Sequence, residues 1–180
     1  MALCDFVIEQ DILGYDCDNP PIKGVESVGL LLNRSDIDGY DKSLHTISLR
    51  CGKKKAYKIV QSGKTPFNGT QQEMQEGANA NTITNTLQIV VLKQDEDWAA
   101  QLHALVNGEF VAVLTDKLGN HQVYGLEAGL HCTGAVRELY NDDNLSGWQI
   151  TFTEEGAAFG NYFITDNNYN VIQQGTAPCL

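Results

Sequence analysis

The stretch "TITNTLQIVVLKQDEDWAAQLHALVNGEFVAVLTD", residues 82–116, decides the fold because it predicts a strand, a helix and a second strand in succession. Residues 82–93 are rich in β-branched side chains, which favour a long strand, and 109–116 predict a strand that starts directly after the helix. A helix of about 12 residues with one apolar stripe is not stable alone. We therefore expect it to lie on a sheet.

The helix is predicted over 95–107. Asp95 is a good N-cap, and Gly108 can end the helix. Four apolar residues at helical spacing form its buried face: Trp98, Leu102, Leu105 and Val106.

The rest of the chain predicts further short strands. They are expected at residues 28–32, 45–52, 56–60, 121–132, 148–155 and 161–165. Short strands separated by turns are typical of sandwiches and barrels. The sequence therefore predicts a mainly β fold: a β-sandwich or barrel of short antiparallel strands with one packed α-helix.

At 180 residues the chain is expected to form one domain, over 25–165. Residues 1–24 have little periodicity and contain two adjacent prolines, so we expect an extended arm. Residues 166–180 are expected to form a C-terminal tail, either loose or docked on a partner.

Residues 61–82 have no strand or helix pattern and are rich in Gly, Gln and Asn. A connection of about 20 residues without secondary structure is uncommon in a compact domain and usually serves a function or a partner. We therefore predict a long loop that contacts a neighbouring subunit. Its predicted contact residues are Phe67, Gln71, Gln72, Met74 and Gln75.

A basic cluster precedes this loop and is formed by Lys53, Lys54, Lys55 and Lys58. Lysines beside an edge strand commonly keep that edge solvated and protect it from aggregation. The alternative is that Lys53, Lys54 and Lys55 contact an acidic surface on an identical copy.

The net charge of −11 argues against a protein that grips nucleic acid, because phosphates need a basic face. No apolar run approaches the roughly 20 residues that cross a bilayer. The N-terminus lacks a basic leader, and the five cysteines are odd in number and widely spaced. We expect synthesis in a reducing cytoplasm, unpaired thiols and no membrane partner.

No catalytic, metal-binding or cofactor-binding constellation is found in the sequence. His131 and Cys132 are neighbours on a predicted strand, so they point to opposite faces and do not form a dyad with each other. A cysteine-dependent enzyme built on Cys132 and another histidine stays an alternative. The sequence favours a protein that is not an enzyme.

The strand "TNTLQIVVL", the helix "DWAAQLHALVNG" and the strands "EFVAVLTD", "VYGLEAGL" and "SGWQITFTEEG" together resemble the tail tube proteins of tailed bacteriophages. The resemblance implies six-fold rings of identical copies that stack into a hollow tube in the virion, assembled in the bacterial host cytoplasm. It also implies other tail or connector proteins as partners, contacts to a neighbouring ring through 61–82, and an acidic lumen past which DNA slides without specific binding.

Two other functions remain open. Within the same class, the chain would be a connector, tail terminator or capsid accessory protein. From another class, it would be a β-sandwich module that binds a small ligand.

Overall fold

The computed structural model describes residues 24–52, 56–61, 64–78, 80–92, 96–138 and 147–174. In chain order the elements are β1 (Val28–Asn33), the 3-10 helix η1 (Arg34–Asp36), β2 (Ile37–Asp41), β3 (Thr46–Leu49), β4 (Tyr57–Val60), β5 (Gln71–Gln75), β6 (Thr82–Val91), α1 (Glu96–Asn107), β7 (Glu109–Thr115), β8 (His121–Tyr124), β9 (Leu130–Glu138), β10 (Gly147–Ala157), β11 (Tyr162–Ile164) and α2 (Asp166–Gln174). Nine strands form one branched sheet, and β2 pairs with β3.

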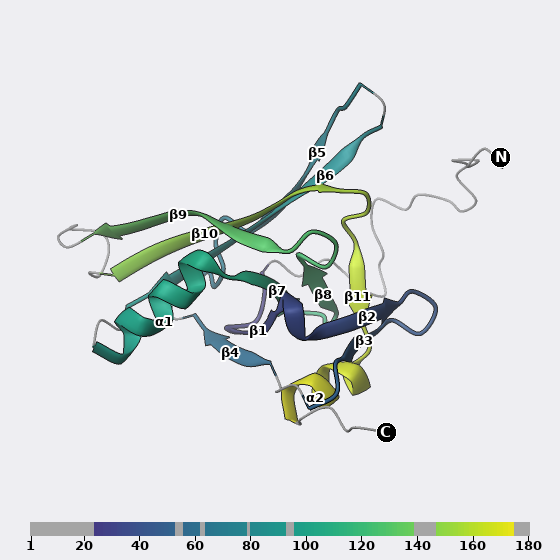
Figure 1. Ribbon diagram of the computed structural model, residues 1–180, viewed down its shortest axis with the longest axis horizontal. Coiled ribbons are helices and arrows are strands. Elements are labelled where there is room, and N and C mark those ends of the chain that lie inside the picture. Colours follow the sequence, from purple (N-terminus) through teal and green to yellow (C-terminus); the bar gives the residue numbers. More distant parts are fainter. Residues whose placement is uncertain are drawn as a thin grey trace.

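β7 lies at the centre of the molecule and is buried on both faces (Figure 1). Because side chains of a strand alternate between faces, its apolar residues divide between two cores. Phe110, Ala112 and Leu114 belong to one core, and Val111 and Val113 belong to the other. Burial on both faces explains why this strand is a continuous apolar run.

The sheet folds over itself into two layers. The outer layer has the strand order β5-β6-β10-β9, and the middle layer has the order β4-β1-β7-β8-β11. The two layers are joined where the first two residues of β9 pair with β7. Leu87, Ile150 and Phe152 of the outer layer pack against Phe110 and Leu114 of the middle layer. The rings of Phe110 and Phe152 meet edge to face with centroids 5.9 Å apart.

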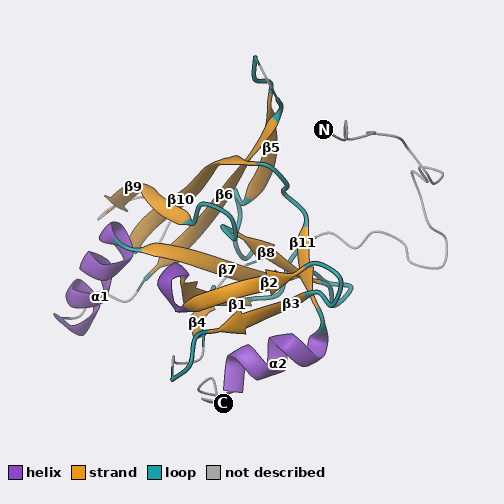
Figure 2. Ribbon diagram, turned by 45° about the vertical axis from the view of Figure 1, so that its right-hand side comes forward, coloured by secondary structure: helices purple, strands orange, loops and turns teal. Residues whose placement is uncertain are grey.

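α1 covers one side of this sandwich core, as the sequence predicts (Figure 2). Trp98, Leu102 and Leu105 pack against the core, and Val106 remains 39% exposed. The helix gives way to β7 at Gly108, where a Cβ atom would lie 2.8 Å from the Ala104 carbonyl oxygen. Glycine therefore permits the abrupt passage from helix to strand.

β2, β3 and α2 form a third layer on the other face of the middle layer. The helix is anchored by Ile172, which is fully buried. The side-chain amide of Asn168 accepts a hydrogen bond from Ile47 N–H (2.9 Å) and donates one to Ile47 C=O (3.1 Å). The Asn168 side chain thus makes the two hydrogen bonds to the Ile47 backbone that a neighbouring strand would make with β3.

The mainly β fold with a helix packed on its core is confirmed. Two expectations about elements are corrected. Residues 61–82 are not a continuous loop, because they contain β5, and 166–180 is not simply a tail, because it begins with α2. The sequence also predicts no element over 34–41, where the structure has η1 and β2. The predicted arm lies outside the described residues except for Gly24.

The prediction of one strand over 121–132 is also wrong, because the chain turns between β8 and β9. The turn is organised by Glu154 of β10, whose side chain is 1% exposed. Its carboxylate accepts four hydrogen bonds of 2.7–3.0 Å, from the backbone N–H groups of Gly125, Glu127 and Ala128 and from Asn85 Nδ2. A buried carboxylate that satisfies three turn N–H groups fixes the path of the chain.

Candidate assembly surface

β5 and β6 form a hairpin that projects from the body (Figures 1 and 2). Their register runs from Gln71 opposite Thr86 to Gln75 opposite Thr82. β5 pairs with no other described strand, so its outer edge presents backbone N–H and C=O groups. A two-stranded piece without a core of its own is marginally stable, which suits a segment that gains contacts on assembly.

The base of this hairpin is tied to the body through side-chain amides. Gln72 Nε2 donates to Asn85 Oδ1 at 2.8 Å and also to Gly160 O. Gln122 Nε2 donates to Gln72 Oε1 at 2.9 Å. Beyond this network the side chains of β5 are exposed, and Met74 has 64% of its surface in contact with solvent.

β4 provides a second free edge, in the middle layer. It pairs with β1, from Val28 opposite Val60 to Leu31 opposite Tyr57, and with no other described strand. Tyr57 and Val60 are 56% and 64% exposed, which is unusual for apolar side chains on a strand. In both views β4 lies on the side of the molecule away from the hairpin tip.

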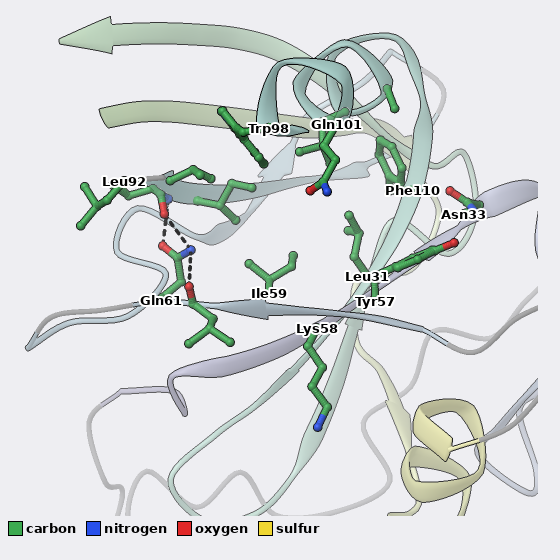
Figure 3. Close-up of a pocket in the computed structure, with 16 residues that line it drawn as sticks. Leu31, Asn33, Tyr57, Lys58, Ile59, Gln61, Leu92, Trp98, Gln101 and Phe110 are labelled. Carbon is green, nitrogen blue, oxygen red and sulfur yellow. Dashed lines mark hydrogen bonds between the residues drawn. The ribbon is translucent and has the colours of Figure 1, made fainter. Parts of the chain in front are cut away.

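A groove of about 790 Å³ runs between β4, the second half of β6 and α1 (Figure 3). Ile59 and Leu31 point into the groove from below, and Trp98 of α1 lies above them. Lys58 points away, to the opposite face of β4. An apolar groove beside a free strand edge is the geometry that accepts an extended strand.

The facing edge of β6 is closed by a side chain. Gln61 is 5% exposed; its Oε1 accepts a hydrogen bond from Val90 N–H (2.8 Å), and its Nε2 donates to Val90 C=O (3.0 Å). Nearby, Thr70 Oγ1 accepts a hydrogen bond from Gln88 N–H at 3.3 Å. Gln61 Nε2 also donates to Val60 C=O of β4 at 3.5 Å, so it engages both edges at that end of the groove. A strand that enters the groove therefore finds the part of β4 before Val60 as its pairing partner.

The predicted contact residues fall into three groups. Phe67 is corrected: it is 4% exposed and belongs to the sandwich core, so it is not offered to a neighbour. Gln72 is half-buried and bonded within the chain, whereas Gln71, Met74 and Gln75 are exposed on the hairpin. Lys53, Lys54 and Lys55 lie outside the described residues.

Sequence reasoning missed the β4 groove. The strand itself is predicted correctly, and Tyr57 and Ile59 alternate with Lys58 and Val60. Which edge of a strand stays unpaired depends on tertiary pairing, so the sequence carries no local signal for it.

A polar cluster holds the end of β10 to the turn before β9. Glu127 accepts hydrogen bonds from the Tyr162 hydroxyl and from the N–H groups of Ala158 (2.7 Å) and Phe159 (3.1 Å). Burial raises the pKa of Glu127, but these hydrogen bonds outweigh it, and the pKa lies below its ordinary value. Burial, the hydrogen bond to Glu127 and the charge of that carboxylate raise the pKa of Tyr162.

Within the described ranges, no three His, Cys, Asp or Glu side chains come together as a metal-binding group. None of the described helices has the length and apolar character needed to cross a membrane. Cys132 is a half-buried free thiol whose Sγ lies 3.6 Å from Gly134 O. Cys51 is disulfide-bonded, which corrects the expectation of an unpaired thiol at that position.

Comparison with known proteins gives no relative for the chain. No protein-family model, curated protein or solved structure matches it.

Proposed function

We propose that the chain is a structural subunit that assembles with identical copies into rings or a tube, as a tail tube component of a tailed-bacteriophage virion. The observation that carries this proposal is a pair of dissimilar free edges, β4 and β5, at separate ends of the branched sheet, in which β11 is a further terminal strand. Two different surfaces that meet between copies make a head-to-tail contact, which generates a ring when it closes and a filament when it does not.

The charge of the chain is compatible with this role. A subunit with a net charge of −11 lines a passage that DNA does not adhere to. The flanking partners of such an object are other tail or connector proteins. The proposal of a tail tube component rests on the sequence resemblance. The proposal of head-to-tail assembly rests on the free edges of β4 and β5.

The test is the oligomeric state of the purified chain. Sedimentation velocity over a concentration series, with negative-stain microscopy of the same samples, is expected to show growth from monomers to rings or rods. A chain that stays monomeric at every concentration contradicts the proposal.

A shortened hairpin gives the matching variant. Replacing residues 75–82 by Asn-Gly joins Met74 to Ile83 through a two-residue turn, which suits an antiparallel pair. Phe67 and the hairpin base stay in place, so we expect the fold to persist, and assembly to weaken because the projecting end of the hairpin is lost. Leu44→Ser is the control, because Leu44 is 63% exposed on a different turn and is expected to leave assembly unchanged.

Small-ligand binding is the second candidate, and the groove beside α1 favours it. Its volume of about 790 Å³ falls in the range of ligand sites, and its lining is largely apolar. A monomeric chain that quenches or enhances the fluorescence of an apolar dye, with loss of the signal on Ile59→Asp, would favour this candidate.

A further inference from the structure

We propose that the outer edge of β5 in one copy pairs with the outer edge of β4 in a second copy, with Glu73 opposite Lys58 and Met74 on the groove face. The inference rests on the proposed self-assembly and identifies the two surfaces that meet. Three features carry it: the free edges, the charges and the strand period.

Both edges present backbone groups that can pair with another strand, but the two edges do not pair with each other within one chain. β4 pairs only with β1, and β5 pairs only with β6, among the described strands. Every second residue of each strand therefore points its backbone N–H and C=O groups away from its neighbour. Since the hairpin tip and β4 lie on opposite sides of the molecule, these two edges do not reach each other within one chain, and a pairing between them needs a second copy.

The charges on the two strands are opposite. Residues 71–78 of the hairpin carry Glu73 and Glu76, both exposed, and no basic residue. β4 carries Lys58, which is exposed, and the sequence just before it is Lys53, Lys54 and Lys55. In a chain of net charge −11, most surfaces of two copies repel each other. β5 of one copy and β4 of another carry opposite charges and therefore attract each other. This attraction favours their contact over contacts between other surfaces of the two copies.

The strand period provides an independent check on the register. Lys58 points away from the groove and Ile59 points into it. When Glu73 lies opposite Lys58, the side chain of Met74 falls on the other face, beside Tyr57 and over the groove. The flexible thioether of Met74 fills an irregular apolar space well. A shift by one residue would instead turn Glu73 into the apolar groove, so charge and packing select the same register.

The closed edge of β6 completes the argument. Because Gln61 occupies both backbone groups of Val90, an incoming strand does not bridge the two layers. The occupant thus extends the middle layer alone. The experiments that follow distinguish β5 of a second copy from two other occupants of the groove, the segment 1–23 and a small apolar molecule.

The first experiment is a cross-link between two different chains. An antiparallel pairing with Glu73 opposite Lys58 also places Met74 opposite Tyr57, at the roughly 5 Å Cβ separation of cross-strand pairs, close enough for a disulfide. Mixing a Tyr57→Cys chain with a Met74→Cys chain under mild oxidation is expected to give a covalent dimer, with a peptide joining positions 57 and 74 in its mass spectrum.

The matched control mixes Tyr57→Cys with Gln71→Cys. Gln71 is then three residues from the position opposite Tyr57, about 10 Å along the strand, and no cross-link is expected. The wild-type chain reports the background from native cysteines. Equal cross-linking at positions 71 and 74 overturns the register, and no cross-link at either overturns the contact.

The second experiment exchanges charges. Lys58→Glu and Glu73→Lys are each expected to weaken association by about tenfold, as when a cross-strand attraction becomes a repulsion. The double variant is expected to recover most of the loss. Both residues are exposed, so unchanged melting temperatures show that folding is intact.

The outcomes separate the inference from the proposed function. A wild-type chain that assembles, with both charge variants unaffected, overturns the β4–β5 contact and leaves self-assembly standing. A chain that never assembles overturns both. Assembly that is lost when residues 1–23 are deleted shows that this segment makes the contact, and an apolar dye that binds the groove without competing with assembly places the partner elsewhere; each result overturns the contact.

Discussion

β7 and β5 belong to the same antiparallel sheet but are held in place by different forces. In β7, five residues in succession are buried, and its side chains fill cores on both faces. In β5, four of five residues are exposed, and the strand is held by pairing with β6 and by the amides around Gln72. Segments that function in binding are drawn from the less stable parts of a fold. The contrast therefore separates the part of the molecule that folds it from the part that is available to a partner.

The sharpest test of this contrast is a truncation in β7. Leu114 is 2% exposed in the sandwich core, so Leu114→Ala leaves a cavity. We expect it to lower the free energy of unfolding by about 2–5 kcal/mol. Urea denaturation followed by circular dichroism measures this loss, and a change below about 0.5 kcal/mol would show that β7 is not the structural centre.

Glu154→Gln tests the boundary between body and hairpin. The carboxylate holds the turn before β9 and, through Asn85, the base of β6. An amide keeps the shape but turns an NH₂ group toward N–H donors, whichever way it is oriented. We expect a loss of about 2 kcal/mol in the free energy of unfolding. Hydrogen exchange should quicken at Gly125 and Ala128 while the β7 amides stay protected; uniform quickening would contradict a local role.

The acid dependence of stability tests the cluster around Glu127. Its pKa in the folded chain is below the ordinary 4.5, despite the opposing effect of burial, because three donors bond its carboxylate. The resulting stability is present above the unfolded pKa and is lost as pH falls through the folded one. Glu127→Gln should cost about 1 kcal/mol at neutral pH, given partial exposure to solvent, and its difference from wild type should shrink below pH 4.5. A difference that is constant from pH 7 to about 3 would contradict this.

The smallest effect is expected on the hairpin. Met74→Ala removes an apolar side chain, as Leu114→Ala does, but from a position that is 64% exposed. The free energy of unfolding of the monomer should change by less than about 0.5 kcal/mol. Association should weaken nevertheless, because Met74 is assigned to the groove of a second copy. A large loss of monomer stability would mean that the hairpin is part of the core.

The same contrast explains what the sequence could predict. β7 and β10 carry apolar patterns imposed by burial, and α1 has one apolar stripe and a glycine at its end, so these elements are visible locally. The β5 sequence, QQEMQ, has no such pattern, because its strand is stabilised by backbone pairing and by residues distant in the chain. Two features of the sequence weakly indicate α2. The Thr165 hydroxyl accepts a hydrogen bond from Asn168 N–H at the start of the helix, and Tyr169 and Ile172 have helical spacing.

The candidate surface was only partly predictable. An amide-rich segment that reaches outward was expected from composition, and Gln71, Met74 and Gln75 are exposed on it. Phe67 was misplaced, because a lone aromatic residue among polar neighbours gives no indication of which core it enters. The free edge of β4 could not be predicted, since it depends on the absence of a second strand beside β4 among the described residues.

The free edges of β4 and β5 belong to different layers, and this sets the shape of any object built from them. A ribbon of strands that continues from one copy to the next would pass from the outer layer of the first to the middle layer of the second. Packed sheets are about 10 Å apart, so each junction offsets the ribbon sideways by roughly that amount. In such an object each copy would be stepped by one layer relative to the copy before it, so the strands of successive copies would not form one continuous plane.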